Sequence, residues 1–231
     1  MALILCIETS TTVCSVALAR DGRVLAARRE DLPNSHSTRL TVLIEELMLE
    51  AGLMMDELAA VAVSSGPGSY TGLRIGVSVA KGLCFALQKP LLSFSSLEVL
   101  AAAFLQSGNA PEDGALLCPL MDARRMEVYT AFFNSDMQMQ GDIRAEIVSG
   151  ESFAAALQQG PVYFFGDGSD KCRVVLTHPN ARFVDEVVPL AAAMASLAQE
   201  RLSRKQFEDV AYFEPFYLKA FQATLPRNKV F

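Results

Sequence analysis

The order of strand and helix signals in the first half of the chain restricts its fold more than any other feature. Three apolar runs come first, at residues 3–7, 13–19 and 24–28, and Asp21-Gly22 between the last two is a dipeptide that favours tight hairpin turns. We therefore expect three antiparallel strands. Helices are then predicted from Asn34 or Ser35 to Ala51 and at residues 69–87 and 96–106, with strands at residues 58–64 and 91–94. This alternation predicts an α/β fold.

A polar stretch at residues 106–114, rich in turn-forming residues, is the best boundary in the chain. We therefore expect two lobes, residues 1–106 and residues 107–231. In the second lobe, strands are predicted at residues 116–121, 127–133, 143–148 and 162–165, and helices at residues 152–159 and 189–202. The order of the first lobe recurs here in shorter form, without a convincing internal sequence repeat. The second lobe is thus expected to be a reduced structural copy of the first.

The balance of residue types excludes several classes of function. Hydrophobic residues make up 51% of the chain, which is enough for a core and excludes disorder. The net charge of -6 argues against a free-standing nucleic-acid binder, because such proteins neutralise phosphates with lysine and arginine. If RNA is the substrate, a partner must hold most of it. The apolar N-terminal run lacks a basic start and is too short for a signal or membrane helix, so we expect a cytoplasmic protein without a membrane partner.

Histidine and cysteine are too sparse for the common metal and hydrolase sites. His36 and His178 are the only histidines, and neither has another histidine four residues away, which excludes helix-borne zinc motifs. The sequence has no Gly-x-Ser-x-Gly turn with a placed histidine. The five cysteines include no C-x-x-C pair, and we interpret them as reduced core thiols rather than catalytic ones. We expect no catalytic set and no metal site.

Polar turns follow the first predicted strand of each lobe, and a glycine pair follows a later strand of the second lobe. Open α/β sheets bind ligands beyond the carboxyl ends of their strands, where hydroxyls and turn amides can hold phosphate oxygens. The glycine pair would let the backbone approach a flat ligand such as adenosine. The candidate nucleotide-site residues are Glu8, Thr9, Ser10, Asp122, Gly166 and Gly168. Ordinary hairpin turns and a strand-ending turn are the alternatives.

A glycine-rich run at residues 65–76 leads into the predicted helix at residues 69–87. In that helix a small residue recurs at every fourth position, at Gly72, Gly76, Ala80 and Cys84. Each interior glycine costs about 1 kcal/mol relative to alanine, so the stripe indicates a very close approach by another helix or a sheet. A phosphate loop is less favoured, because the lysine and Ser/Thr pair of G-x-x-x-x-G-K-[ST] is missing.

The first two helices also predict a surface for a partner. One face of the first helix is apolar and packs on the sheet, yet Val42 and Leu49 project from nearly the opposite side and should be covered as well. In the second helix, Arg74 could meet a carboxylate or phosphate, with a surface ion pair as the alternative. The candidate partner-surface residues are Val42, Leu49, Gly72, Arg74, Gly76 and Ala80.

Several of these segments together resemble the TsaB (YeaZ) family. The resemblance lies in residues 3–10, 14–18, 66–76, 122–124, 127–129 and 214–218. It implies an actin-like ATPase fold, shared with acetate kinase, sugar kinases, Hsp70 and actin, with two lobes of which the second is reduced. The group is also called Gcp-like or glycoprotease-like, although none of the residues above supports proteolysis.

The resemblance further implies a non-catalytic subunit that binds a TsaD catalytic subunit through its first two helices. With the ATPase TsaE, such a complex forms N6-threonylcarbamoyladenosine at position 37 of tRNAs that read A-starting codons. No cofactor is implied for this subunit, and weak ATP or ADP binding is implied mainly at the partner subunits. Leu40 stands four residues after His36, as in TsaB and unlike metal-binding TsaD, while Glu8 replaces the aspartate common in the family.

Two other interpretations stay open. An ATP-dependent small-molecule kinase of the same superfold would need two full lobes and a catalytic carboxylate. A homodimeric interaction protein would pair the exposed helix surface with itself, and the subunit could behave in this way without its partner. Lys219, Arg227 and Lys229 are candidates for tRNA contact, with a plain solvated surface as the alternative.

Overall fold

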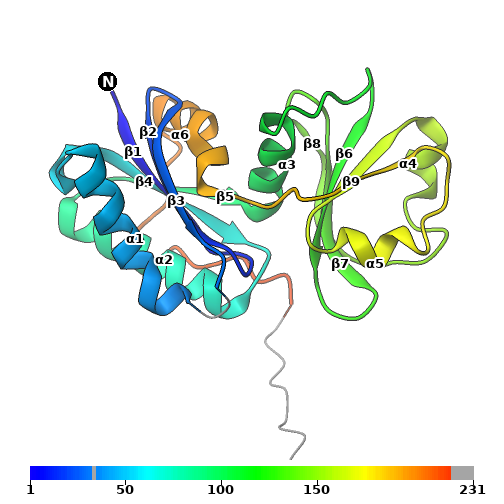
Figure 1. Cartoon of the computed structure of the whole chain (residues 1–231), viewed down its shortest axis with the longest axis horizontal. Helices are drawn as coiled ribbons and strands as arrows, with labels where there is room; N and C mark the ends of the chain where they lie inside the picture. The colour runs from blue at the N-terminus through cyan, green and yellow to red at the C-terminus, as the bar shows by residue number, and fades with distance from the viewer. Residues whose placement is uncertain (33–34, 220–231) are drawn as a thin grey trace, which may run out of the picture.

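Two five-stranded mixed sheets stand side by side, with a helix between them (Figure 1). The computed structural model describes residues 1–32 and 35–219 of the chain. Within this part of the chain, no helix is both long enough and apolar enough to cross a membrane. The α/β class expected from the alternation of signals is confirmed.

The first sheet has the strand order β3-β2-β1-β4-β5. Its strands are β1 (Leu3–Glu8), β2 (Cys14–Arg20), β3 (Arg23–Glu30), β4 (Leu58–Gly66) and β5 (Leu91–Ser95). β1 pairs antiparallel with β2, which pairs antiparallel with β3, whereas β1–β4 and β4–β5 are parallel. The predicted hairpin turn lies at Asp21-Gly22, where both residues have positive φ angles, 50° and 79°.

Helices cover both faces of this sheet, which explains why β1 is apolar at successive positions. Leu5 and Ile7 face α1 (His36–Ala51) and α2 (Tyr70–Leu87). Ile4 and Cys6 face the opposite layer, which comprises α3 (Ser96–Gln106), η2 (Ala191–Met194) and α6 (Ala195–Ser203). The three helices expected in the first lobe are confirmed, although Asn34, one of the two expected first residues of α1, lies outside the described residues.

The second sheet repeats the topology of the first. Its strands are β6 (Leu116–Asp122), β7 (Glu127–Phe133), β8 (Met139–Ile147), β9 (Val162–Phe165) and β10 (Ala181–Val184), in the order β10-β9-β6-β7-β8. β6–β7 and β7–β8 are antiparallel, and β6–β9 and β9–β10 are parallel, as in the corresponding pairs of the first sheet. The prediction of a structural copy is thus confirmed at the level of strand order.

The helices of the copy are much shorter than those of the original. In chain order, α4 (Ala154–Gln159) and α5 (Ser169–Arg173) correspond to α1 and α2 of the first half. The first half also has the short η1 (Met55–Glu57) after α1. α5 was not predicted because five residues are too few for helical periodicity, and β10 was not predicted because Arg182 interrupts its apolar residues, whereas the equally short β9 is a continuous apolar run. The strand expected at residues 143–148 was placed too late, since β8 begins at Met139.

α3 lies between the sheets and contributes to two cores (Figure 1). Val99 and Ala102 pack with the first sheet, while Leu100 and Phe104 pack with the second. The helix expected at residues 189–202 is η2 followed by α6, and it returns to the first sheet. The predicted boundary between residues 106 and 107 therefore assigns α6 to the second lobe, although α6 packs on the first sheet.

Candidate functional site

The turn after β1 begins with buried residues and becomes exposed only at Thr12. Glu8 and Thr9 have no exposed surface and Ser10 has 1%. The backbone amide of Ser10 donates to Oε1 of Glu8 at 2.6 Å. The other carboxyl oxygen of Glu8 and the hydroxyls of Thr9, Ser10 and Ser64 are also buried. Burial raises the pKa of the Glu8 carboxyl, while the nearby hydroxyl and backbone amide of Ser10 and the hydroxyl of Ser64 oppose this change.

α2 closes this turn. A Cβ atom at Gly72 or Gly76 would lie well under 3.0 Å from the backbone oxygen or hydroxyl of Thr9, and Gly68 is equally close to Ser10. The amide of Ser69 also donates to the backbone oxygen of Ser10 at 2.7 Å. The close approach predicted from the glycine stripe therefore exists, and it is made by the β1–β2 turn of the chain itself.

The position of this stripe corrects part of the expected partner surface. Gly72, Gly76 and Ala80 are buried and face the core of the first sheet. They are not available to a partner in this structure, because the β1–β2 turn and β4 occupy the space beside them. Val42 is half-buried, and Arg74 is exposed with its guanidinium 4.6 Å from the centre of the Tyr70 ring.

Two exposed apolar side chains mark the outer surface of α1 and α2. Leu49, near the end of α1, is 74% exposed, and Phe85, near the end of α2, is 82% exposed. Phe85 was missed in the sequence, where it is hidden in the apolar run at residues 83–87. The sequence held one indication of this exposure: Phe85 comes directly after Cys84 of the buried stripe, and consecutive residues of a helix point to different sides.

The turn after β6 is exposed, and its carboxylate already has partners. Asp122 pairs with Lys171, and its Oδ1 also accepts the amide of Arg124 at 3.0 Å. The backbone amide of Asp122 donates to Oδ1 of Asp167 at 2.9 Å. Burial raises the pKa of the Asp167 carboxyl, while the amide of Asp122 opposes this change.

Gly166 and Gly168 lie next to Asp122 in space, but the chain itself fills the space beside them. A Cβ atom at Gly166 would lie 2.5 Å from the backbone oxygen of Leu120. The amide of Gly168 donates to the same oxygen at 3.0 Å. These glycines thus allow the β9–α5 loop to approach β6.

The six candidate nucleotide-site residues form two groups, one at each sheet, and the binding of a nucleotide there stays a prediction.

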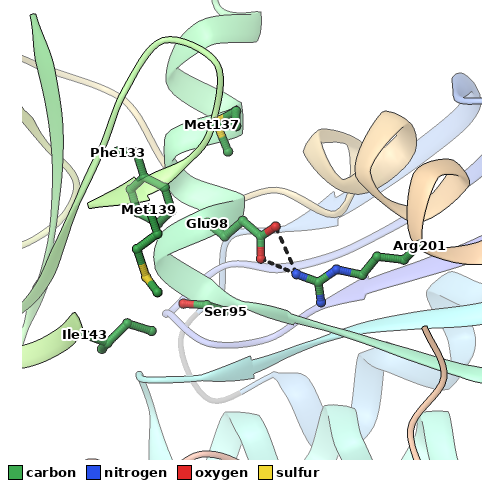
Figure 2. A pocket seen from close by; sticks show the side chains of 7 residues that line it. All are labelled: Ser95, Glu98, Phe133, Met137, Met139, Ile143 and Arg201. Carbon is green, nitrogen blue, oxygen red and sulfur yellow. Dashed lines mark hydrogen bonds and ion pairs between the residues drawn. The ribbon is translucent and has the colours of Figure 1, made fainter. Parts of the chain in front are cut away.

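A surface cavity with a volume of about 310 Å³ lies between the sheets. Figure 2 shows its lining, which consists of Ser95, Glu98, Phe133, Met137, Met139, Ile143 and Arg201. None of the six candidate nucleotide-site residues is among them. Nη2 of Arg201 donates to both carboxyl oxygens of Glu98, at 3.0 and 2.7 Å, and the guanidinium lies 4.0 Å from the centre of the Phe94 ring. The charged groups of this cavity therefore bind each other.

The remaining candidates show no catalytic grouping. Among the described residues, no three His, Cys, Asp or Glu side chains are grouped as metal ligands. All five cysteines are buried and free, and burial raises the pKa of the Cys6 and Cys118 thiols to about 12, so both remain protonated. Lys219 pairs with Glu127, while Arg227 and Lys229 lie outside the described residues.

Known proteins are similar to nearly the whole chain. The family model described as "TsaD: tRNA N6-adenosine threonylcarbamoyltransferase" matches residues 30–226. The tRNA threonylcarbamoyladenosine biosynthesis protein TsaB of Haemophilus influenzae is 30% identical over 225 residues, which cover 94% of this chain and 93% of that protein. The solved structure of YeaZ from Pseudomonas aeruginosa has a TM-score of 0.78 and 30% identity, and the match covers 94% of this chain and 100% of that chain.

A more distant structure shares only the fold. The activator of the 2-hydroxyisocaproyl-CoA dehydratase from Clostridium difficile is 10% identical, with a TM-score of 0.52 over 90% of this chain and 98% of that chain. Together with the repeated strand order, these likenesses confirm the expected two-lobed, actin-like ATPase fold. The chain belongs to the TsaD-type threonylcarbamoyltransferase family and, within it, to the TsaB (YeaZ) proteins of tRNA threonylcarbamoyladenosine biosynthesis.

Proposed function

We propose that this chain is the non-catalytic subunit that binds and supports a TsaD-type catalytic subunit. The product of the complex is N6-threonylcarbamoyladenosine at position 37 of tRNAs that read A-starting codons, and a TsaE-type ATPase acts with it in the cytoplasm. The observation that carries this proposal is the match to curated TsaB over 94% of the chain.

The outer surface of α1 and α2 supports the partnership. Leu49 and Phe85 expose most of their apolar surface near the same end of two neighbouring helices. Burial of such side chains against a partner removes apolar area from water, at about 25 cal/mol per Å². Because both side chains point away from the core, they can be changed at little cost to folding.

The buried turn after β1 supports a non-catalytic role. The carboxyl of Glu8 is fully buried, and α2 with the loop before it lies on the next two residues, Thr9 and Ser10, so a substrate cannot reach this carboxyl in the structure. We infer that the subunit requires no cofactor and that ATP or ADP binds mainly at the partner subunits. For the same reason, the alternative of a small-molecule kinase has less support, since its catalytic carboxylate would have to face an open cleft.

The test measures two quantities: binding of this chain to the TsaD-type protein, and modification of tRNA by the complex. The chain and the TsaD-type protein of the same organism are co-purified, and tRNA modification is then measured with and without this chain. The double variant Leu49→Glu/Phe85→Glu should bind the partner at least about tenfold more weakly, because two charges would be buried without partners.

Val174→Glu is the matched control, since Val174 is 75% exposed but follows α5 in the second lobe. It should bind as the native chain does. Modification that proceeds equally well without this chain would contradict the proposal, as would full binding by the double variant.

The same apolar surface also favours a second state, in which two copies of the chain bind each other through α1 and α2 when no partner is present. Sedimentation of the isolated chain tests this: a dimer should form, and it should dissociate in the Leu49→Glu/Phe85→Glu variant and on addition of the TsaD-type protein.

A further inference from the structure

The β6–β7 turn holds two arginines in an unfavourable backbone conformation. Arg124 and Arg125 have φ angles of 69° and 50°, in the left-handed region that residues with a Cβ atom avoid. Asparagine and glycine are the usual residues where a hairpin needs two consecutive positive φ angles. Both side chains are exposed, so core packing does not explain their presence. Strained backbone of this kind indicates a functional constraint.

Lysines pair with two carboxylates beside this turn, while a third carboxylate, that of Asp167, accepts the backbone amide of Asp122. Asp122 pairs with Lys171, which also donates to the backbone oxygen of Glu127 at 2.6 Å. The side chain of Glu127 pairs with Lys219. Neither Arg124 nor Arg125 has a carboxylate partner among the described residues. The turn therefore presents two exposed arginines that belong to no ion pair among the described residues, on a chain whose net charge is -6.

The C-terminal segment brings one of these lysines to the turn. The amide of Phe216 donates to the backbone oxygen of Ser65, at the end of β4, at 2.7 Å. The Tyr217 and Tyr70 rings then lie 4.9 Å apart, and Lys219 reaches Glu127 at the start of β7. The described part of this segment ends between the two halves of the molecule (Figure 1). The C-terminal segment thus connects the end of β4 in the first half with the start of β7, next to the β6–β7 turn.

From this arrangement we propose that Arg124 and Arg125 bind backbone phosphates of the RNA substrate in the assembled complex. The proposal rests on the proposed function. A guanidinium matches the geometry of a phosphate with two parallel hydrogen bonds, and adjacent arginines on a narrow turn can reach neighbouring phosphates. An acidic protein surface is the less favoured occupant, because the core of a protein–protein interface is poor in charged residues, whereas Arg124 and Arg125 lie beside the charged pair of Asp122 and Lys171.

The test measures binding of unmodified tRNA to the complex of this chain with the TsaD-type protein, over a series of salt concentrations. In Arg124→Gln/Arg125→Gln, affinity should fall about tenfold near 0.1 M salt, and the slope of log K against log salt should become shallower by about 2, one for each lost phosphate contact. Arg124→Lys/Arg125→Lys should keep most of the slope, because it keeps the charges. Arg23→Gln, a change at an exposed arginine of β3, should alter neither quantity.

Three results overturn the proposal. The glutamine variant could hold tRNA with native affinity and slope. It could lose ATP binding while tRNA binding is kept, which would assign the turn to free nucleotide phosphates. It could lose the TsaD-type protein in sedimentation, which would assign the turn to an acidic protein surface. A native chain that does not associate with the TsaD-type protein would instead contradict the proposed function, and this proposal with it.

Discussion

The turn after β1 and the turn after β6 occupy the same position in two sheets of the same strand order, yet one is buried and the other is exposed. In each sheet, glycines after the fourth strand bring a loop onto the end of the first strand: Gly68 lies on Ser10, and Gly168 on Leu120. The difference lies in the helix that follows, which has 18 residues in α2 and five in α5. In the first sheet this helix adds two close contacts to the turn, from Gly72 and Gly76 to Thr9, and so helps to bury it.

The largest effect is expected where α2 touches the buried turn. In Gly72→Ala the new Cβ atom would overlap the backbone oxygen of Thr9, so the free energy of unfolding should fall by about 3 kcal/mol or more. Gly82→Ala is the matched change on the same helix, with no atom within 4 Å, and should raise it by up to about 1 kcal/mol. Urea unfolding followed by circular dichroism measures both. If the two changes altered the free energy of unfolding equally, the close contact between Gly72 of α2 and Thr9 would be contradicted.

A smaller effect, which depends on pH, is expected at Glu8. Because burial raises its pKa in the folded state, the folded protein holds this proton more tightly, and stability is lost as the pH rises from the ordinary value of 4.5 through the raised value. Glu8→Gln removes this loss, so the variant should be more stable than the native chain at pH 7, by about 1 kcal/mol or more, and not below pH 4. Unfolding midpoints across this range measure the difference.

Asp122→Asn is the matched change in the exposed turn. It removes a partly exposed ion pair with Lys171 and should cost under about 1 kcal/mol. If Glu8→Gln lowered stability at pH 7, the hydrogen bonds from Ser10 and Ser64 to the Glu8 carboxylate would outweigh the cost of burying its charge, and the comparison of the two turns would have to be revised.

Gly168→Ala tests how tightly the loop after β9 packs on β6 in the second sheet. The new Cβ atom would lie 3.0 Å from Cγ1 of Val128 and 3.1 Å from the backbone oxygen of Leu120, which is tight but not an overlap. We expect a loss of about 1 kcal/mol, well below the loss for Gly72→Ala. The same urea experiment ranks the two variants, and the reverse order would mean that the second turn is the more tightly closed one.

The smallest effect is expected for Lys171→Met, which removes the partner of Asp122 and one donor to the backbone of Glu127. The loss should be about 0.5 kcal/mol and should shrink as salt is added, since exposed pairs are screened. Gly72→Ala should show no such dependence. Unfolding in low and high salt separates the two, and a salt-independent loss would point to packing rather than charge.

The fold was predictable from the sequence where patterns were long. The hairpins and the helices of the first lobe carry apolar periodicity over many residues, and each was placed within a few positions. The short helix α5 was not predicted because it has less than two helical turns. The strand β10 was not predicted because Arg182 interrupts its apolar residues. The return of α6 to the first sheet depends on contacts between residues far apart in sequence, such as the amide of Ala191 with the hydroxyl of Ser15 at 2.9 Å.

The site was predictable only in part. Glycines at every fourth position indicated a close approach but not its partner, because a small residue suits a neighbouring turn and a neighbouring protein equally well. The burial of Glu8 could not be foreseen, because it depends on segments far apart in the sequence: α2 and the loop before it lie on Thr9 and Ser10, the residues that follow Glu8. The exposure of Phe85 likewise depends on which side of α2 the sheet covers.

α3 has a consequence for how the molecule unfolds. Its Val99 belongs to the core of the first sheet and its Phe104 to that of the second, so neither core can open without disturbing a helix that the other needs. The two halves should therefore melt in a single calorimetric transition, with equal calorimetric and van't Hoff enthalpies. The amide protons of α3 should exchange with solvent only when the whole protein unfolds.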